Sequence, residues 1–196
     1  MNLPNKLTVS RFALTALFLG VMFSPMPHRE TVALGIFAAG GITDFLDGTI
    51  ARRRGLITTF GILMDPLADK IMVCSAFIAF VEFRWMPAWM VVLVVARELS
   101  ITGLRLLAAS RNVVLGAERY GKHKTISQIV AILAILVFAS HQEWGSAGQA
   151  IFGWQIGGAA WIWWFAELAK WVAILLTAYS GWVYLWKNRM LYLKDM

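Results

Sequence analysis

The sequence contains six long apolar stretches, and they constrain the fold more than any other feature. Each stretch approaches the ~20 apolar residues that an α-helix needs to cross a bilayer. Hydrophobic residues make up 59% of the 196 residues and charged residues 15%, whereas a soluble domain is about 45–50% apolar and about one-quarter charged. We therefore predict an all-α, polytopic membrane protein in which residues 1–196 form a single domain. The six transmembrane helices are predicted at 7–24, 31–50, 61–83, 86–109, 122–140 and 161–186.

The first apolar stretch also resembles part of a signal peptide, because Lys6 and Arg11 precede most of it. No small-residue cleavage site follows, so we predict a retained span. Residues 141–160 are rich in glycine and nearly uncharged, and we predict an interfacial loop there. Aromatic residues mark both ends of the last span, where they are expected at the two membrane surfaces. They are Trp161, Trp163, Trp164, Trp182, Tyr184 and Trp186.

Lysine and arginine residues are distributed unevenly between the predicted loops. One side of the membrane receives both termini, the 52–60 loop and the 105–124 region, which carry most of the positive charge. The other side receives Arg29 and Arg84. Because positively charged loops stay in the cytoplasm, we predict that both termini are cytoplasmic and that the protein lies in the inner (cytoplasmic) membrane. The formal net charge of +7 follows from these loops, so we predict no nucleic-acid partner.

Two acidic pairs lie near the ends of predicted spans, in the stretches TDFLDG (43–48) and MDPLAD (64–69). The short connection between these spans makes them antiparallel neighbours, so both pairs should reach a similar depth near the cytoplasmic surface. An ionised aspartate at the bilayer centre costs about 2.5–3.5 kcal/mol, so four of them require partners. No histidine or cysteine accompanies them, and an all-oxygen site suits Mg²⁺ or Mn²⁺. The alternative is an ion-pair network with Arg52, Arg53 or Lys70.

The run DFLDGTIARRRGLITTFGILMDPLAD fits the pattern D-x2-D-G-x2-A-R-x8-G-x3-D-x3-D at every fixed position. This pattern is the signature of the CDP-alcohol phosphatidyltransferases, which the chain therefore resembles. The opening LPNKLTVSRF and the six spans are similar to that family as well. Within it, ARELSITGLRLLAASR and GKHKT resemble the bacterial phosphatidylglycerophosphate synthases. The fixed positions of the pattern are Asp44, Asp47, Gly48, Ala51, Arg52, Gly61, Asp65 and Asp69.

The resemblance implies transfer of a phosphatidyl group from CDP-diacylglycerol to an alcohol, with release of CMP, in a homodimer surrounded by membrane lipids. It makes Asp69 the general base on the acceptor hydroxyl. The implied ligands of two Mg²⁺ or Mn²⁺ ions are Asp44, Asp47, Asp65 and Asp69. Residues expected to bind CDP-diacylglycerol are Gly48, Ala51, Arg52, Gly61, Asn5, Thr8 and Arg11. The small residues have an alternative role in close helix packing, and Asn5 and Thr8 have one at the start and cap of the first helix.

The segment 97–124 determines which acceptor we predict. Its basic residues are Arg97, Arg105, Arg111, Arg119, Lys122 and Lys124. Their cytoplasmic position alone is one explanation for them, but Arg97 and Arg105 lie inside the predicted fourth span and close to one face of it. Guanidinium groups bind phosphate through paired hydrogen bonds. We therefore predict that these residues bind the phosphate of sn-glycerol 3-phosphate, giving phosphatidylglycerophosphate; inositol phosphate or serine is the alternative acceptor.

A cation transporter is the alternative from another functional class, because intramembrane carboxylates also form ion sites. A non-catalytic membrane scaffold is a further alternative. Among the remaining polar residues, His28, His123 and His141 are predicted at the surface. Lys170 is predicted to pair with Glu167, which lies three residues before it in the last span.

Overall fold

The computed structural model describes the backbone of residues 3–54, 59–111, 113, 115 and 119–193. Side chains are described for these residues except 3–8, 44–54, 59–66, 69, 119–122 and 193. Within those ranges the chain forms six long helices, whose predicted positions are confirmed to within a few residues. They are α1 (Leu3–Met22), α2 (Arg29–Arg54), α3 (Thr59–Glu82), α4 (Ala88–Ser110), α5 (Arg119–Ser140) and α7 (Trp161–Lys187). A short helix, α8 (Met190–Leu193), follows the last of them.

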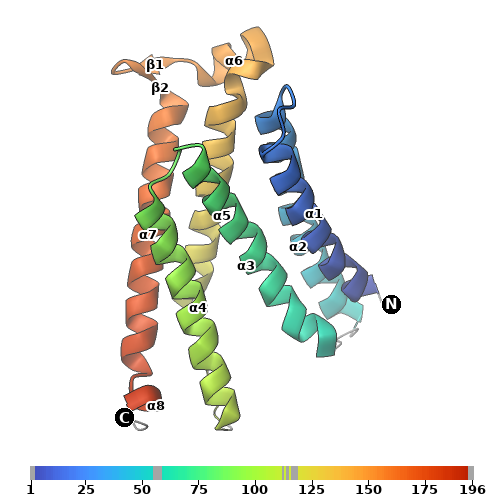
Figure 1. Cartoon of the computed structure of the whole chain (residues 1–196), viewed down its shortest axis with the longest axis vertical. Helices are drawn as coiled ribbons and strands as arrows, with labels where there is room; N and C mark the ends of the chain where they lie inside the picture. Colours follow the sequence, from blue (N-terminus) through green and yellow to red (C-terminus); the bar gives the residue numbers. More distant parts are fainter. Residues whose placement is uncertain (1–2, 55–58, 112, 114, 116–118, 194–196) are drawn as a thin grey trace.

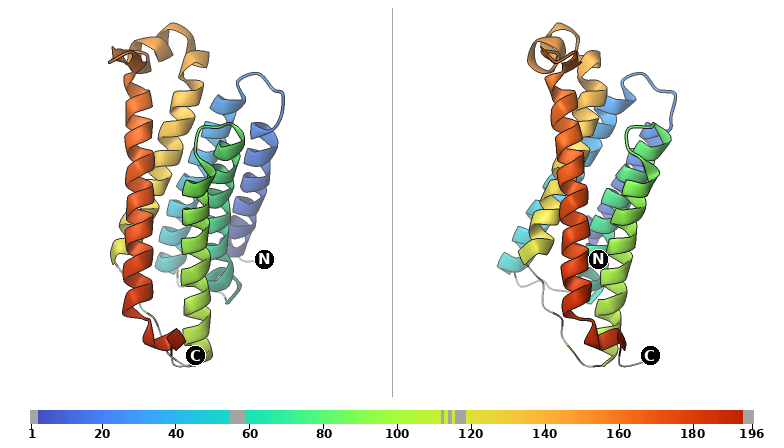
Figure 2. Two further views of the ribbon diagram at one scale, coloured as in Figure 1. Left: turned by 60° about the vertical axis from the view of Figure 1, so that its left-hand side comes forward. Right: turned by 90° about the vertical axis from the view of Figure 1, so that its left-hand side faces the viewer.

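The long helices run roughly along the long axis of the molecule, and both chain termini lie toward the same end (Figure 1). We call this the terminal end, and we call the opposite end, which carries the short helix α6, the capped end. α1 packs against both α2 and α3, whereas α5 packs along α7 and α2. α4 packs against α7 and α3. In the left-hand view of Figure 2, α1 and α7 therefore lie on opposite flanks of the bundle.

Proline residues mark the turns between helices at the capped end. α1 ends at Met22, shortly before Pro25 and Pro27, and α4 begins directly after Pro87. Proline has no backbone N–H and disfavours helical geometry in the residue before it, so it separates helices at these points. The positive φ of 58° at Arg84 completes the turn between α3 and α4.

An apolar core lies between the helices toward the capped end. Its fully buried side chains include Phe18 of α1, Phe77 and Phe80 of α3, and Ile132 and Leu136 of α5. Buried alanines between them let the helix backbones approach closely, as is common in membrane proteins. This core holds α1, α3 and α5 together and fixes the register of the helices that carry the polar residues described below.

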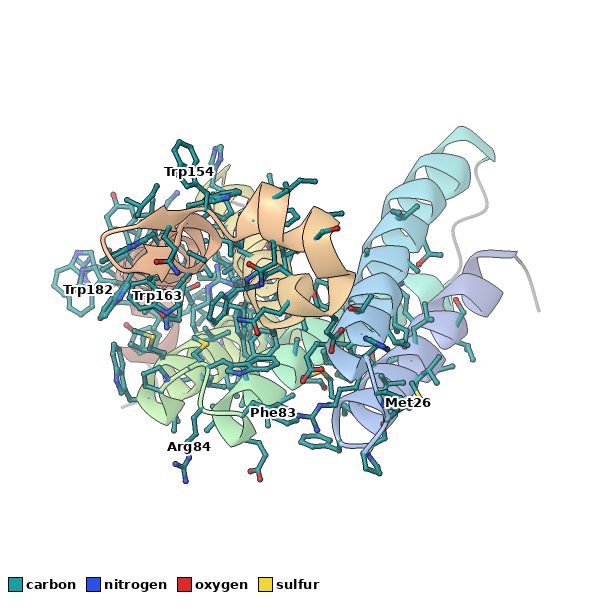
Figure 3. The ribbon with its side chains drawn as sticks, turned by 90° about the horizontal axis from the view of Figure 1, so that it is seen from above. Met26, Phe83, Arg84, Trp154, Trp163 and Trp182 are labelled. Carbon is teal, nitrogen blue, oxygen red and sulfur yellow. The ribbon has the colours of Figure 1, made fainter. Side chains whose placement is uncertain are left out.

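Residues 141–160 cover the capped end and are folded, so the prediction of a loop is wrong. They form a 3₁₀ turn η1 (His141–Trp144), helix α6 (Gly145–Phe152) and a hairpin of β1 (Gln155–Ile156) and β2 (Ala159–Ala160). Gly157 and Gly158 form its two-residue turn with φ angles of 60° and 89°, values that glycine adopts at little cost. Trp154 beside this hairpin is 74% exposed and projects outward (Figure 3).

The cap is tied to α2 by side-chain hydrogen bonds. Glu143 accepts hydrogen bonds from the backbone N–H of Thr31, at 3.3 Å, and from the Thr31 hydroxyl. The indole of Trp144 donates to the same hydroxyl oxygen at 2.9 Å. These bonds satisfy backbone and side-chain groups at the start of α2 that its own helix leaves unpaired.

Three smaller predictions are also wrong. His141 is buried rather than at the surface, with its Nδ1 atom 2.6 Å from the Phe138 carbonyl oxygen. Tyr184 is buried against α4, so it does not belong to an aromatic belt. α1 begins at Leu3, which places Asn5 and Thr8 inside the helix rather than at its start.

Two helical segments among the described residues are long and apolar enough to cross a membrane. They are His123–Phe152, with 30 residues, and Trp161–Lys187, with 27 residues. Val9–Met22 is a shorter apolar helix. The other long helices carry several charged residues, because they include the two acidic pairs and part of the basic segment.

Candidate active site

The two helices that carry the acidic pairs come close to each other at Gly40 of α2 and Met72 of α3. A Cβ atom on Gly40 of α2 would overlap Cε and Sδ at the tip of the Met72 side chain on α3, so a larger residue at position 40 would displace that side chain. Asp44 and Asp47 follow Gly40 by four and seven residues. Asp69 and Asp65 precede Met72 by three and seven. These spacings place each pair on the helix face that carries the contact.

Counting residues from the ends of α2 and α3 gives the same alignment of the acid pairs, independently of the Gly40–Met72 contact. Asp44 lies ten residues before the end of α2 at Arg54. Asp69 lies ten residues after the start of α3 at Thr59. At a rise of 1.5 Å per residue, each is about 15 Å along its helix from the connection between the two. By the same calculation, Asp47 and Asp65 each lie about 10 Å along their helices from the connection. The backbone therefore brings the two acid pairs to equal depth.

Many of the predicted site residues lie on four of the long helices, but the structure does not describe their side chains. On α2 they are Asp44, Asp47, Gly48, Ala51 and Arg52; on α3 they are Gly61, Asp65 and Asp69; on α1 they are Asn5 and Thr8; on α5 they are Arg119 and Lys122. Arg11 is described: it is buried near the terminal end of α1, the helix that packs on both acid-bearing helices.

A buried polar cluster lies beside α3 at the same half of the molecule. Oε1 of Glu98 on α4 accepts hydrogen bonds from Nη1 of Arg97, at 3.1 Å, and from Nζ of Lys124 on α5. Nζ of Lys70 on α3 donates to the Thr102 hydroxyl, which donates in turn to the Glu98 carbonyl oxygen at 2.8 Å. We call Lys70, Arg97, Glu98, Thr102 and Lys124 the Glu98 cluster.

The predicted acceptor arginines on α4 face α7. A Cβ atom on Gly181 of α7 would lie 2.9 Å from Cγ of Arg97. Arg105 donates from Nε to the Tyr184 hydroxyl at 3.3 Å, and its guanidinium lies 5.8 Å from the centroid of that ring. The prediction that Arg97 and Arg105 lie on one face of the helix is therefore confirmed. Arg111, just after α4, donates to the Leu191 carbonyl oxygen of α8 at 2.7 Å and so anchors the C-terminal segment.

The chain matches the family model of the CDP-alcohol phosphatidyltransferases over residues 1–182. The chain belongs to this family. The match includes both acidic pairs and the whole Glu98 cluster, and it extends well beyond the signature at 44–69.

Three relatives within this family are similar over most of the chain. A CDP-diacylglycerol–glycerol-3-phosphate 3-phosphatidyltransferase of Bacillus subtilis is 38% identical over 199 residues, which cover 95% of each chain. A protein of the same name from Rickettsia bellii is 33% identical over 93% of each chain. A probable phosphatidylglycerophosphate synthase of Mycobacterium tuberculosis is 42% identical over 134 residues, which cover 67% of this chain and 64% of the relative.

The site contains polar residues that the family signature and the sequence did not single out. Glu98 and Thr102 were not predicted, and Lys70 appeared only as a possible ion-pair partner for the aspartates. Glu98 had a usable signal, because a carboxylate inside a predicted transmembrane span marks a functional position by default. The same signal applies to Lys70, which lies inside the predicted third span, whereas Thr102 had none, since its contact with Lys70 joins two helices.

Proposed function

We propose that the chain transfers the phosphatidyl group of CDP-diacylglycerol to sn-glycerol 3-phosphate, yielding phosphatidylglycerophosphate and CMP. Support comes from the family membership and from relatives whose names state this reaction. It comes also from the basic residues of the Glu98 cluster, which suit an acceptor that carries a phosphate. Serine carries none, and inositol phosphate is the remaining alternative.

The observation that carries the proposal is the matched register of the two acid pairs about the contact of Gly40 with Met72. Two carboxylate pairs at one depth repel each other unless cations lie between them. A pure ion-transport site would explain the carboxylates, but it would not require the adjoining D-G-x2-A-R pattern. A phosphate-handling site explains both.

The donor set fits divalent metal ions. Asp44, Asp47, Asp65 and Asp69 offer only oxygen ligands, which suit Mg²⁺ or Mn²⁺, and the family is generally dependent on divalent metals. We propose that these four residues hold two ions. When bound, the ions would hold the pyrophosphate of the donor and offset the negative charge that develops on the leaving oxygen.

The other steps fall to the chain itself. We assign Asp69 as the base that accepts the proton of the acceptor hydroxyl, because an alcohol is a weak nucleophile at neutral pH. The acceptor oxygen forms a new bond to the phosphatidyl phosphorus, the bond from that phosphorus to CMP breaks, and CMP leaves. Arg52 and Arg11 are proposed to contact donor phosphates, with Gly48, Ala51 and Gly61 leaving room for the nucleotide and Asn5 and Thr8 beside it.

The acceptor phosphate is proposed to bind the basic residues of segment 97–124. Arg97 and Lys124 lie in the buried cluster, whereas Arg105 is exposed and lies on Tyr184 of α7. Arg111 is occupied by the C-terminal segment, which makes it the weakest candidate of the described residues. Arg119 and Lys122 remain proposed acceptor residues at the start of α5.

We further propose that all six long helices cross the inner membrane as one domain, with both termini and the acid pairs on the cytoplasmic side. Both termini lie toward the same end of the molecule (Figure 1), and most lysine and arginine residues occur in sequence near the termini, the connection after α2 and the connection after α4. Engineered cysteines on a Cys74→Ala background test this in intact cells. An impermeant thiol reagent should label His28→Cys and not Gly55→Cys, and the reverse result would overturn the topology. A homodimer stays a prediction from the family.

The activity is tested with purified protein, labelled CDP-diacylglycerol and Mg²⁺, offered glycerol 3-phosphate, inositol phosphate or serine in turn. We expect CMP release and phosphatidylglycerophosphate formation with glycerol 3-phosphate. EDTA should abolish turnover, and added Mg²⁺ or Mn²⁺ should restore it. Preferred turnover with another acceptor would refute the acceptor assignment, and activity that survives EDTA would refute the metal site.

A further inference from the structure

The Glu98 cluster contains more positive than negative charge. Three cations come from three different helices: Arg97 and Lys124 donate to the single carboxylate of Glu98, and Lys70 donates to the hydroxyl of Thr102 beside it. Among the described side chains, no carboxylate lies within ion-pair distance of Lys70. Burying unbalanced charge is costly, so a cluster of this composition is suited to an incoming anion with two charges.

Glu98 determines where two of these cations lie. One oxygen, Oε1, accepts a hydrogen bond from Arg97 and another from Lys124. The side chains are 12% exposed for Arg97, 5% for Lys124 and 9% for Glu98, so solvent does little to screen them. Nε of Arg97 is buried and has no hydrogen-bond partner among the described residues. The guanidinium is thus held by one nitrogen and keeps a donor available.

Helix packing does not account for the ion pair. In the described part of the chain, α5 packs mainly along α7, and α4 packs on α7 and α3 rather than on α5. The Glu98–Lys124 pair therefore joins two helices that otherwise contact each other little. Replacing a buried ion pair by apolar residues is often neutral or stabilising, so stability is a poor reason for this arrangement.

The cluster also adjoins the proposed catalytic acids. Lys70 directly follows Asp69 in the chain and reaches across to Thr102 on α4. Thr102 is bonded to the backbone carbonyl of Glu98. A phosphate held at this cluster would therefore place the rest of a short acceptor molecule near the residue proposed as the base.

We propose that Glu98 is the positioning residue of the acceptor site, because it holds Lys124 and Arg97 at one point, with Lys70 beside them, to receive the phosphate of the acceptor. This inference rests on the proposed function. It adds Lys70 to the phosphate-binding residues and gives Glu98 a role through its neighbours rather than through contact with the substrate.

The test compares Glu98→Gln, Lys124→Met and the double variant with the wild type. Glu98→Gln should raise the KM for glycerol 3-phosphate about 10- to 100-fold, by analogy with the loss of a residue that orients a metal ligand. The KM for CDP-diacylglycerol should stay unchanged. The double variant should show less than the product of the two single effects, because both changes act on one interaction.

Thr177→Val supplies the matched control, because it breaks another buried interhelical hydrogen bond, from Gln128 to Thr177 at 2.9 Å, outside the cluster. It should lower thermal stability without changing either KM. If Glu98→Gln behaved like this control, or raised both KM values equally, Glu98 would be structural only. Should Glu98→Gln fail to fold, Glu98→Asp takes its place, and a wild-type KM in that variant would overturn the proposal.

The failure of this inference is distinguishable from failure of the proposed function. Wild-type protein that does not use glycerol 3-phosphate would refute the function. Wild-type protein that uses it, with an unchanged KM in Glu98→Gln, would refute the inference alone. Calorimetric titration of glycerol 3-phosphate into donor-free protein reads binding without turnover, and Glu98→Gln should bind more weakly there as well; equal binding by both proteins would count against the inference.

Discussion

Among the described side chains, each half of the molecule contains one buried lysine paired with a glutamate, and the two pairs differ in their surroundings. Toward the capped end, Lys170 of α7 pairs with Glu167 one turn earlier, as predicted, and also donates to the Trp85 carbonyl oxygen at 3.3 Å. Toward the terminal end, Lys124 pairs with Glu98 on another helix, in company with Arg97 and Lys70.

This difference separates a structural pair from a binding site. The Lys170 pair is balanced in charge, lies within one helix and fastens the turn between α3 and α4 to α7. Among the described side chains the Glu98 cluster carries an excess of positive charge, and its Glu98–Lys124 pair joins α4 and α5, which pack little on each other. A buried pair of balanced charge has a structural explanation, whereas a buried excess of positive charge among the described side chains favours a binding role, because it needs a ligand.

The largest expected effect lies in the terminal half. Asp69→Asn should lower kcat by about 10²- to 10⁴-fold, the usual worth of a general base, while binding of CDP-diacylglycerol persists because three carboxylates remain. Turnover and equilibrium binding of the labelled donor measure the two separately. Retention of more than about one-tenth of the rate would exclude Asp69 as the base.

The next effect tests the register of the acid pairs. Gly40→Leu should displace the Met72 side chain from the contact between α2 and α3, alter the spacing of these helices and lower kcat by about tenfold or more, since small misplacement of reacting groups costs up to about 10²-fold. Gly35→Leu, on the same helix, is the matched control, because a Cβ at Gly35 meets nothing within 4 Å. Equal activity of the two variants would show that this contact does not position the acids.

A moderate effect on stability is expected at the other lysine. Lys170→Met should lower the free energy of unfolding by about 1–3 kcal/mol, because it leaves Glu167 and the Trp85 carbonyl without their donor. Neither KM should change. Thermal unfolding in detergent and steady-state kinetics check this, whereas Lys124→Met should raise the KM for glycerol 3-phosphate. A raised KM for glycerol 3-phosphate in Lys170→Met would remove the contrast between the two pairs.

The smallest effect is expected at the cap. Trp154 is 74% exposed, so Trp154→Ala should change the free energy of unfolding by no more than about 0.5 kcal/mol. Turnover should equal that of the wild type. A loss of activity in this variant would mean that the capped end takes part in the reaction, which would contradict the placement of the reaction in the terminal half.

The helices could be predicted from the sequence, whereas contacts between helices could not. Long apolar runs separated by polar, charged or proline-containing connections leave few choices for where a helix begins and ends, and all six long helices were found. The fold of residues 141–160 was missed because a neutral, glycine-rich segment shows neither helical nor strand periodicity. The burial of Tyr184 was missed because composition at a helix end does not reveal which face meets a neighbour.

The candidate site likewise has one part that the sequence predicts and one part that depends on contacts between helices. The acid pairs stand at fixed spacing within 26 residues, so the sequence carries them. The Glu98 cluster draws on α3, α4 and α5, and its members are separated by up to 54 positions, from Lys70 to Lys124. Hydropathy assigns such residues only to a side of the membrane, and packing decides which of them meet.

The Glu98–Lys124 pair has a consequence for how the chain would enter the membrane. α4 carries Arg97, Glu98 and Arg105, and each such charge costs about 2.5–3.5 kcal/mol at the centre of a bilayer. The partner of Glu98 lies on α5, which the ribosome makes later. α4 would therefore be a poor substrate for insertion until α5 arrives, and the two helices would leave the translocation channel as one unit.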